Sequence, residues 1–415
     1  MVIAGWCGFG IIFGMKRIYE ELFADHLRHN RQMLFVSGPR QVGKTTLAKL
    51  VLPEGRYFNY DRTSDALLFA KGPDGLAETL GFDQPSARAT SVIFDEIHKY
   101  RQWKRFVKGF FDVYGERVKI VATGSARMDV YRRGGDSLMG RYFGYRVHPL
   151  TIGELASPTV DLESVFQSPK NLGEVDIPRL MEFGGYPEPF LNGTRRFYNR
   201  WQNSRLDKIF AEDLRDLSRV QDLRGVRALS ELLTARVTGE ISYVSLARDL
   251  GVTADTVKNW IGLLEGVYFC YEIRPYFKNV ANSIRKTPKI YLWDWSLLSD
   301  PGARAENFVA SHLLKSVDWW TDSGLGRFEL AYIRDKQQHE VDFVVVRDGL
   351  PFMLVECKMS AKEPMSANLK SFAAKLKVLY AYQVAIGAPP SDVNPLEFKN
   401  EPIRIAFADL AKVMI

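Results

Sequence analysis

The chain has 415 residues, 46% of them hydrophobic and 25% charged, with a formal net charge of +7 at pH 7. This length and composition predict globular material in more than one domain, because a single hydrophobic core rarely supports so long a chain, and the positive charge weakly favours a polyanionic partner. Three cysteines far apart in the sequence and six histidines without zinc-like spacing argue against a disulfide framework or a zinc site, and they favour a reducing, cytoplasmic compartment.

Residues 1–14 differ from the rest of the chain, because they are apolar, rich in glycine and free of charge. They are too short to span a membrane and lack the basic segment that opens a signal peptide. We interpret them as an extra N-terminal tail before an amphipathic helix that begins at Met15. No later segment approaches the length of a membrane span, so no membrane partner is expected.

A glycine-rich loop follows the first strand-like run, Met33–Val36, and leads into a helical pattern. Gly38 and Gly43 let the backbone curl so that its N–H groups surround a polyphosphate at the N-terminus of that helix. We expect Lys44 to reach the β- and γ-phosphates of ATP and Thr45 to give a hydroxyl to Mg²⁺. The loop residues expected to contact the nucleotide are Gly38, Pro39, Arg40, Gln41, Val42, Gly43, Lys44, Thr45 and Thr46.

A second acidic strand would complete such a site. The run Ser91–Phe94 predicts a buried parallel strand, and two carboxylates, Asp95 and Glu96, follow it at the end that opens into the site. We expect Asp95 to hold Mg²⁺ and Glu96 to orient and polarise the attacking water. The alternative is that these acids cap a helix that begins near Ile97.

From Met15 to about Leu150, strand and helix patterns alternate as they do in a doubly wound α/β domain. One of the strands, Val118–Ser125, ends in a Thr-Gly-Ser turn. The hydroxyls of Thr123 and Ser125 are therefore placed to sense the γ-phosphate or to position water. Ordinary turn chemistry is the alternative.

The loop GPRQVGKTT, the acidic strand IFDEIH and the turn TGSA together resemble the AAA+ class of P-loop ATPases, particularly its archaeal-type branch. The resemblance implies ATP hydrolysis and self-association into a ring, for which a hexamer is the first expectation. It also implies that an arginine before the fifth strand enters the neighbouring subunit's site, a position held by Arg141, with Arg132 and Arg133 as competitors. Residues 151–215 would form a helical lid over the nucleotide. The lid's sensing arginine stays open among Arg179, Arg195 and Arg196.

Residues 216–287 predict a winged-helix domain. A short amphipathic helix, a turn at Gly251 and a second helix capped by Thr253 form a helix-turn-helix pattern, and Val267–Ile273 alternates like a strand of the wing. The exposed face of the second helix is only weakly basic, so packing or protein contact is the alternative to DNA binding. The residues expected to read DNA are Asp255, Lys258 and Asn259.

Residues 288–415 hold a second candidate site. A hairpin centred on Gly349 would place Asp342 opposite Glu356, and period-two alternation would put Lys358 on the same face as Glu356. Two facing carboxylates are costly unless a cation lies between them, and a nearby lysine can orient or deprotonate a water.

This constellation is similar to the restriction-endonuclease-like (PD-D/ExK) family, although Val341 stands where that family has a proline. The resemblance implies an α/β domain in which Asp342, Glu356 and, from an upstream helix, Glu306 bind Mg²⁺ or Mn²⁺. The alternatives are an inactive relic of a nuclease and an exposed cluster of salt bridges.

The complete prediction is an α/β protein with an AAA+ P-loop domain and helical lid, a winged-helix domain, and an α/β restriction-endonuclease-like C-terminal domain. We expect an ATPase that acts on DNA. The residues expected to be catalytic are Glu96, Thr123 and Arg141 at the ATP site and Asp342, Glu356 and Lys358 at the nuclease-like site. The alternative is a nucleotide-switched regulatory module that binds partners through its C-terminal half and neither translocates nor cuts.

Overall fold

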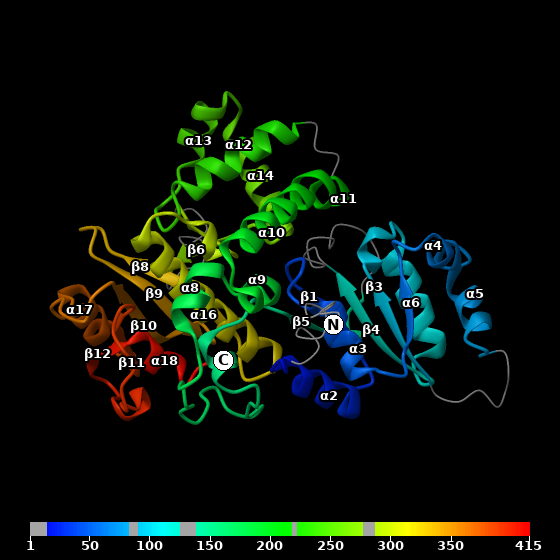
Figure 1. Cartoon of the computed structure of the whole chain (residues 1–415), viewed down its shortest axis with the longest axis horizontal. Coiled ribbons are helices and arrows are strands. Elements are labelled where there is room, and N and C mark those ends of the chain that lie inside the picture. The colour runs from blue at the N-terminus through cyan, green and yellow to red at the C-terminus, as the bar shows by residue number, and fades with distance from the viewer. Residues whose placement is uncertain (1–14, 83–89, 125–137, 218–221, 277–286) are drawn as a thin grey trace, which may run out of the picture. The chain divides into compact units, whose positions relative to one another are not determined.

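A computed structural model (Figure 1) describes residues 15–82, 90–124, 138–217, 222–276 and 287–415. The expectations for the N-terminal tail and for Ser125, Arg132 and Arg133 lie outside these residues. The chain divides into two compact units, which are described separately. The first unit consists of Met1–His148, Arg205–Arg219 and Gly266–Tyr268, and the second of Pro149–Ser204, Val220–Glu265 and Phe269–Ile415.

A five-stranded parallel sheet forms the centre of the first unit, with its strands in the order β2-β3-β4-β1-β5. Because all five strands run the same way, their carboxyl ends share one edge, where ligands bind in folds of this kind. The predicted α/β domain with a parallel sheet is confirmed. Its strands are β1 (Met33–Ser37), β2 (Arg56–Asn59), β3 (Thr90–Asp95), β4 (Val118–Gly124) and β5 (Tyr142–Arg146). Its helices are α2 (Tyr19–His29), α3 (Lys44–Val51), α4 (Thr63–Ala70), α5 (Gly72–Thr79), η1 (Ile97–Lys99), α6 (Trp103–Tyr114), η3 (Ile209–Asp213) and α11 (Leu214–Leu217).

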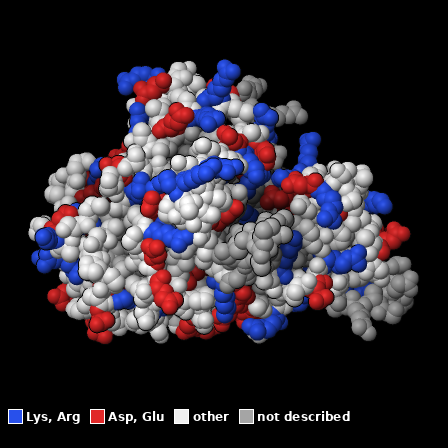
Figure 2. Space-filling model, viewed as in Figure 1, with Lys and Arg blue, Asp and Glu red and all other residues white. Residues whose placement is uncertain are grey.

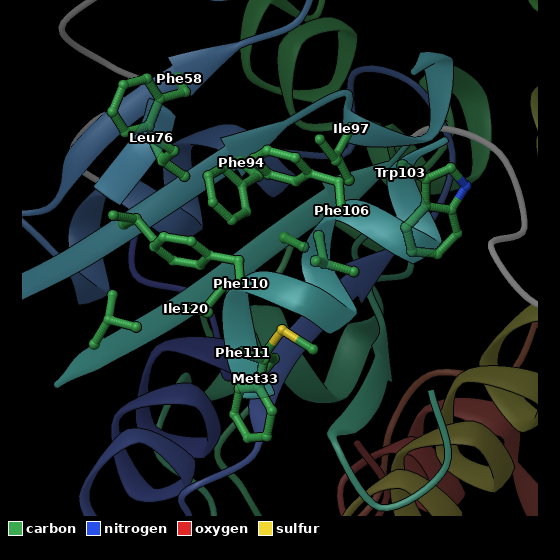
Figure 3. Packing of buried hydrophobic residues seen from close by; sticks show 14 of the residues in the cluster. Met33, Phe58, Leu76, Phe94, Ile97, Trp103, Phe106, Phe110, Phe111 and Ile120 are labelled. Atoms are coloured by element: carbon green, nitrogen blue, oxygen red, sulfur yellow. The ribbon is translucent and has the colours of Figure 1, made fainter. Parts of the chain in front are cut away.

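Helix α6 packs against this sheet through aromatic residues at helical spacing (Figure 3). The rings of Phe106 and Phe110 lie 5.9 and 6.1 Å from that of Phe94 in β3, and Ile120 of β4 belongs to the same cluster. Each of these side chains is at most 3% exposed, and burying one contributes about 1.5–3 kcal/mol. This cluster therefore fixes β3 and, with it, the acidic residues at its carboxyl end.

A seven-stranded mixed sheet forms the centre of the second unit, in the order β12-β11-β10-β9-β8-β6-β7. Helix α17 packs on it through Leu369 and Phe372, which cluster with Leu354 of β10. The strands are β6 (Cys270–Pro275), β7 (Lys289–Leu292), β8 (Phe328–Arg334), β9 (Glu340–Arg347), β10 (Leu350–Lys358), β11 (Tyr380–Ala385) and β12 (Pro402–Ala406). The helices wholly or mostly in this unit are α7 (Ile152–Ala156), α8 (Ile177–Phe183), α9 (Pro187–Asn192), α10 (Arg195–Lys208), α12 (Leu223–Thr234), α13 (Tyr243–Leu250), α14 (Ala254–Gly266), η4 (Trp295–Leu297), α16 (Pro301–Asp322), α17 (Ala367–Leu376), η5 (Pro395–Glu397) and α18 (Phe407–Ala411).

The expected helix-turn-helix is present as α13 and α14. Gly251 ends α13 in the left-handed conformation, and the Thr253 hydroxyl accepts a hydrogen bond from the Thr256 N–H at 3.1 Å, as a cap does. The inward face of α14 is buried at Val257, Trp260, Ile261 and Leu264. Its exposed residues include Asp255, Lys258 and Asn259.

Part of the expected wing strand is present as β6, which begins at Cys270 and pairs antiparallel with β7, while the winged-helix assignment itself stays a prediction. Strand β6 pairs antiparallel with β7 and parallel with β8, where Arg274 lies opposite Ala331, so it belongs to the seven-stranded sheet. The strand prediction is confirmed for residues 270–273, whereas residues 267–269 precede β6, and the sequence pattern does not show that the end of β6 also pairs with β8. The C-terminal sheet therefore includes Cys270, well before residue 288.

The expected lid, residues 151–215, is divided between the two units. Residues 149–204 belong with the second unit, where Trp295 Nε1 donates to the carbonyl oxygen of Leu180 at 3.0 Å. Only residues 205–219 belong with the unit that contains the glycine-rich loop. The contacts therefore do not form one continuous lid.

The β9–β10 hairpin reaches the expected pairing by an unexpected route. Its turn, residues 348–349, would place Asp342 opposite Val355 if the ladder continued regularly from it. A β-bulge at Phe352 shifts the pairing by one residue. Glu356 therefore comes opposite Asp342.

In the part of the chain that the structure describes, no helix is long and apolar enough to cross a membrane. On the face shown in Figure 2, Lys and Arg side chains are interspersed with Asp and Glu side chains over most of the surface. The positive net charge is therefore not gathered into a single field on that face.

Candidate functional site

The glycine-rich loop lies between β1 and α3, at the carboxyl edge of the parallel sheet. Gly38 has a φ of 149° and Gly43 a φ of 101°, conformations that other residues rarely adopt. A Cβ atom at Gly38 would also collide with the backbone oxygen of Val147. The curled shape of the loop therefore requires glycine at both ends.

Lys44 is the first residue of α3 and is only 6% exposed. Its Nζ donates hydrogen bonds to the carbonyl oxygens of Gly38 at 2.8 Å and Pro39 at 2.7 Å. Burial lowers the pKa of Lys44 to about 8, although the nearby charges of Glu96 and Asp95 oppose this shift. The ammonium group is thus held inside the loop, where a rotation of the side chain would bring it to a bound polyphosphate.

Asp95 is the residue on which three hydroxyl groups converge. The Thr45 hydroxyl donates to its two carboxylate oxygens at 3.1 and 3.0 Å, and the Tyr57 hydroxyl donates at 2.6 Å. The Thr123 hydroxyl also donates to Asp95. Thr45 and Asp95 are thereby brought together as predicted, whereas Thr123 orients Asp95 here and does not face open space.

Glu96 follows β3 in the left-handed region, with a φ of 54°. This conformation costs a residue other than glycine about 1–3 kcal/mol and is concentrated at functional sites. The Glu96 side chain makes no capping bond to η1, so the capping alternative lacks support. Its Oε2 lies 3.7 Å from Nε2 of His98, and its charge acts on Lys44.

Arg17 is a member of the site that the sequence did not reveal. Its guanidinium donates to the carbonyl oxygen of Val42 in the loop and to that of His148, each at 2.8 Å. It is 5% exposed. Arg17 therefore ties the loop to the segment after β5, but a lone arginine ahead of the first strand carries no sequence signal for this role.

Arg40, in the middle of the loop, forms a second unforeseen contact. It pairs with Glu212 at 2.8 Å and with Asp213 at 2.5 Å, both in the π-helix η3. Burial raises the pKa of Asp213 to about 6, against the opposing charge of Arg40. These partners are more than 170 residues apart in sequence, which is why no local pattern predicts them.

Arg141 lies away from its own loop. It precedes β5, whose start pairs with Met33 at the start of β1, so it sits at the opposite edge of the sheet from the carboxyl ends. Its Nε and one terminal nitrogen donate to Asp112 at 2.6 and 3.0 Å. Of the candidate lid arginines, Arg179 donates to the carbonyl oxygen of Phe190 and Arg195 pairs with Glu182, all within the second unit.

The second unit brings Asp342, Glu356 and Lys358 together. One Asp342 oxygen accepts the N–H of Cys357 at 2.8 Å, and Lys358 Nζ donates to Oε1 of Glu356 at 3.0 Å. Burial, followed by the charge of Asp342, raises the pKa of Glu356 to about 7. The pKa of Asp342 is also raised by burial. The site therefore disfavours two negative charges at once.

Glu306 is only partly in this group. Burial and then the charge of Asp342 raise its pKa to about 7, but its Oε1 accepts the Tyr291 hydroxyl at 2.8 Å and lies 3.7 Å from Lys289 Nζ. Lys289 is buried and also pairs with Glu340 at 2.6 Å. Sequence reasoning missed this lysine, a buried cation that already lies beside a carboxylate expected to bind metal.

Mg²⁺ or Mn²⁺ would fit the pair Asp342 and Glu356 better than the expected set of three. Glu356 Oε2 is buried without a hydrogen-bond partner, which a hard cation would supply. Among the described residues, however, no three His, Cys, Asp or Glu side chains are grouped closely enough to hold a metal ion. The ligand set that includes Glu306 is therefore not assembled, and water or a phosphate would have to complete the coordination.

Replacing Glu356 by glutamine should stabilise the protein at high pH. Because the pKa of Glu356 is about 7 in the folded chain against an ordinary value of 4.5, the folded form retains a proton that the unfolded form has lost. Stability from this group is thus complete below pH 4.5 and is lost as the pH rises towards 7. We expect the Tm of Glu356→Gln at pH 8, without nucleotide or metal, to exceed that of wild type by a few degrees, as scanning fluorimetry would show.

Adding Mg²⁺ should raise the Tm of wild type at pH 8 and leave that of Glu356→Gln nearly unchanged, because a ligand that binds only the folded form stabilises it. Glu340→Gln is the matched control. Glu340 pairs with buried Lys289 and with Arg334, each at 2.6 Å, so this change should lower the Tm at pH 5 and pH 8 alike. A full Mg²⁺ response in Glu356→Gln would contradict the assignment.

Residues 30–156 match the family described as AAA domain. Residues 174–301 and 301–395 match two families that are each described as a domain of unknown function, DUF8612 and DUF4143. The chain is 24% identical over 375 residues to an uncharacterized protein of Mycobacterium tuberculosis, covering 84% of this chain and 75% of that protein. It is 22% identical over 410 residues to an uncharacterized protein of Methanocaldococcus jannaschii, covering 88% and 89% of the two chains.

Two solved structures are similar to parts of this chain. A Walker-type ATPase of Pyrococcus abyssi shares 14% identity and a TM-score of 0.39, covering 69% of this chain and 98% of that one. DnaA from Aquifex aeolicus, bound to AMPPCP, shares 15% identity and a TM-score of 0.31, covering 60% and 88%. TM-scores this low leave the roles of individual residues to the geometry of this chain.

Proposed function

We propose that this chain, which carries an ATPase domain of the AAA+/P-loop type in its first unit, hydrolyses Mg²⁺-bound ATP and uses the reaction to act on DNA. The observation that supports hydrolysis most strongly is the junction of Thr45 and Asp95. Lys44 directly precedes Thr45 in the chain, and Glu96 directly follows Asp95. Four residues from two separate stretches of sequence thus meet at the edge of the sheet where ligands bind.

Each of these residues has a defined task in the proposed reaction. Lys44 exchanges its bonds to the loop carbonyls for bonds to the phosphates, and the backbone N–H groups of the loop hold the same anion. Thr45 and Asp95 would hold Mg²⁺, which supplies positive charge to the β- and γ-phosphates when it is bound. Glu96 accepts a hydrogen bond from the attacking water and takes its proton.

Action on DNA is supported by the helix-turn-helix and by the net charge of +7. Helix α14 presents Lys258 and Asn259 to solvent, residue types that contact phosphates and base edges. Asp255 on the same exposed face weakens this argument, because a carboxylate repels the phosphate backbone. The helix-turn-helix therefore suits a weak contact with DNA, to which cations elsewhere in the chain would have to add.

We further propose a metal-dependent phosphodiesterase site at Asp342, Glu356 and Lys358. The unpartnered oxygen of Glu356 and its raised pKa support cation binding. A bound Mg²⁺ or Mn²⁺ would polarise the scissile phosphate. Lys358, held by Glu356, would stabilise the charge that develops on the phosphate oxygens.

Ring assembly with Arg141 acting in a neighbouring subunit is the remaining part of the proposal. Arg141 is at the far edge of the sheet from its own loop, so it serves another subunit's site more readily than its own. Its Nε and one terminal nitrogen bind Asp112, and the remaining N–H groups of the guanidinium would contact the phosphates in the neighbouring subunit.

Mixing two inactive variants tests this arrangement. Arg141→Ala lacks the arginine and Glu96→Gln lacks the base, so each alone should be nearly inactive. A mixture should regain a measurable fraction of wild-type phosphate release, because some interfaces then combine an intact Arg141 with an intact Glu96. Arg105→Ala, at an exposed position of α6, is the control and should keep wild-type phosphate release. A monomer by light scattering, with activity independent of protein concentration, would contradict action in trans.

The alternative function is a nucleotide-switched module that binds partners. The contact between Arg40 in the loop and Asp213 in η3 favours it, since π-helical turns occur often at functional sites and this one touches the nucleotide loop directly. Such a switch would bind nucleotide with almost no turnover, and DNA would not change its rate.

A further inference from the structure

A cavity of about 360 Å³ opens at the edge of the parallel sheet opposite the nucleotide loop. Its walls come from the end of α2 and the residues after it, from the first residue of β3, and from the turn that leads into β4. Because β1, β3 and β4 begin at this edge and end at the other, the cavity and the nucleotide loop are separated by the length of the strands.

The cavity is strongly basic. Arg28, Arg31, Arg117 and Lys119 line it, against one carboxylate, Glu116. Asp25 offsets part of this charge from outside the lining, at 3.9 Å from Arg28 and 2.9 Å from His29. The cations in the lining still outnumber these carboxylates. On the face shown in Figure 2, by comparison, positive and negative side chains are mostly mixed. An anionic ligand is what such a lining selects.

Lys119 is unusual for its position. It lies in β4, the central strand of the sheet, where neighbours Val118 and Ile120 are buried and an apolar residue is the rule. Its Nζ donates to the carbonyl oxygen of Asn30 at 3.0 Å. An ammonium group has three N–H donors, so one bond to Asn30 leaves two for a ligand in the cavity.

Arg31 is the second fixed cation. Its guanidinium lies over the ring of Phe111, 5.4 Å from the ring centre. This cation–π contact helps to hold the side chain, and the guanidinium has five N–H donors that can bind phosphate oxygens. The cavity thus combines a half-buried ammonium with a guanidinium placed over an aromatic ring.

We propose that this cavity binds the phosphate backbone of a nucleic acid strand. The cations come from two separate segments, so together they can contact more than one phosphate. This favours a strand with successive phosphates over a single small anion. The inference rests on the proposed action on DNA, and it adds a contact that the weakly basic α14 does not supply. ATP and the strand would then occupy opposite edges of one sheet, so neither would block the other.

The test is the binding of a labelled single-stranded DNA oligonucleotide, measured by fluorescence anisotropy over a range of salt concentrations. Arg28→Glu/Arg31→Glu should raise the Kd at least about tenfold and reduce the salt slope by about one per lost phosphate contact. Lys119→Met should weaken binding in the same direction. The matched control is Arg62→Glu/Lys71→Glu, an equal charge change at exposed residues of the same unit.

Folding is checked by ATP binding, which should survive in every variant because the loop lies at the other edge. Equal losses in the cavity variant and the control would show a general charge effect and overturn the proposal. Unchanged affinity in the cavity variant would overturn it while leaving action on DNA intact. A wild type that binds no DNA would overturn both, and displacement of the oligonucleotide by inorganic phosphate at similar concentration would show a site for small anions.

Discussion

Glu96→Gln is expected to bind ATP about as tightly as wild type and to hydrolyse it about 10²- to 10⁴-fold more slowly, which is the usual contribution of a general base. Glutamine keeps the size and the hydrogen-bonding oxygen of the side chain but cannot accept a proton from water. Binding is preserved because Lys44 and the loop hold the phosphates in the ground state. Nucleotide fluorescence and steady-state phosphate release measure the two effects separately.

Lys44→Ala, in contrast, should lose nucleotide binding, and hydrolysis with it. Its removal leaves the loop carbonyls without their donor and the phosphates without a buried positive charge. Lys49→Ala is the matched control, since Lys49 lies in the same helix with its Nζ over the Tyr57 ring at 3.9 Å. Wild-type turnover in Glu96→Gln would show that another residue activates the water.

Asp342→Ala and Lys358→Ala are each expected to reduce metal-dependent DNA cleavage at least about a hundredfold, because each removes a group that acts on charge in the transition state. Lys362→Ala is the control for the lysine, since it is exposed and lies beyond the end of β10. Labelled single-stranded, duplex and branched DNA with Mg²⁺ or Mn²⁺ would be the substrates.

Two outcomes would contradict the nuclease-like site. Cleavage that persists in both variants would point to a contaminant or another site. A wild type that neither cuts any substrate nor shows the Mg²⁺-dependent rise in Tm would identify Asp342 and Glu356 as a relic. The two measurements are independent, because the Tm response does not require a substrate.

The parts of the fold that local sequence determines were predicted well. The spacing of Gly38, Gly43 and Lys44 leaves few conformations other than a curled loop before a helix. A run of apolar residues ending in Asp95 and Glu96 likewise has few interpretations other than a buried parallel strand. In both cases the chemical groups and the backbone that positions them lie within ten residues.

The errors and omissions arise where distant segments meet. Strand β6 pairs antiparallel with β7, the next strand in the chain, but its second partner β8 lies more than fifty residues further along, so its place in the C-terminal sheet was missed. Arg17, Arg40 and Lys289 contact groups that no spacing rule connects to them. The pairing of Asp342 with Glu356 was correct because the bulge at Phe352 offsets the turn, which the sequence does not show.

The rate of ATP hydrolysis with and without DNA tests the central claim most directly. Wild type would be assayed at saturating ATP and Mg²⁺ with single-stranded, duplex and branched DNA, alongside Glu96→Gln at the same concentration. An ATPase that acts on DNA should turn over ATP faster with at least one of these forms, and Glu96→Gln should stay inactive with all of them. Tight nucleotide binding with negligible turnover, unchanged by any DNA, would contradict the proposal and favour the nucleotide-switched module.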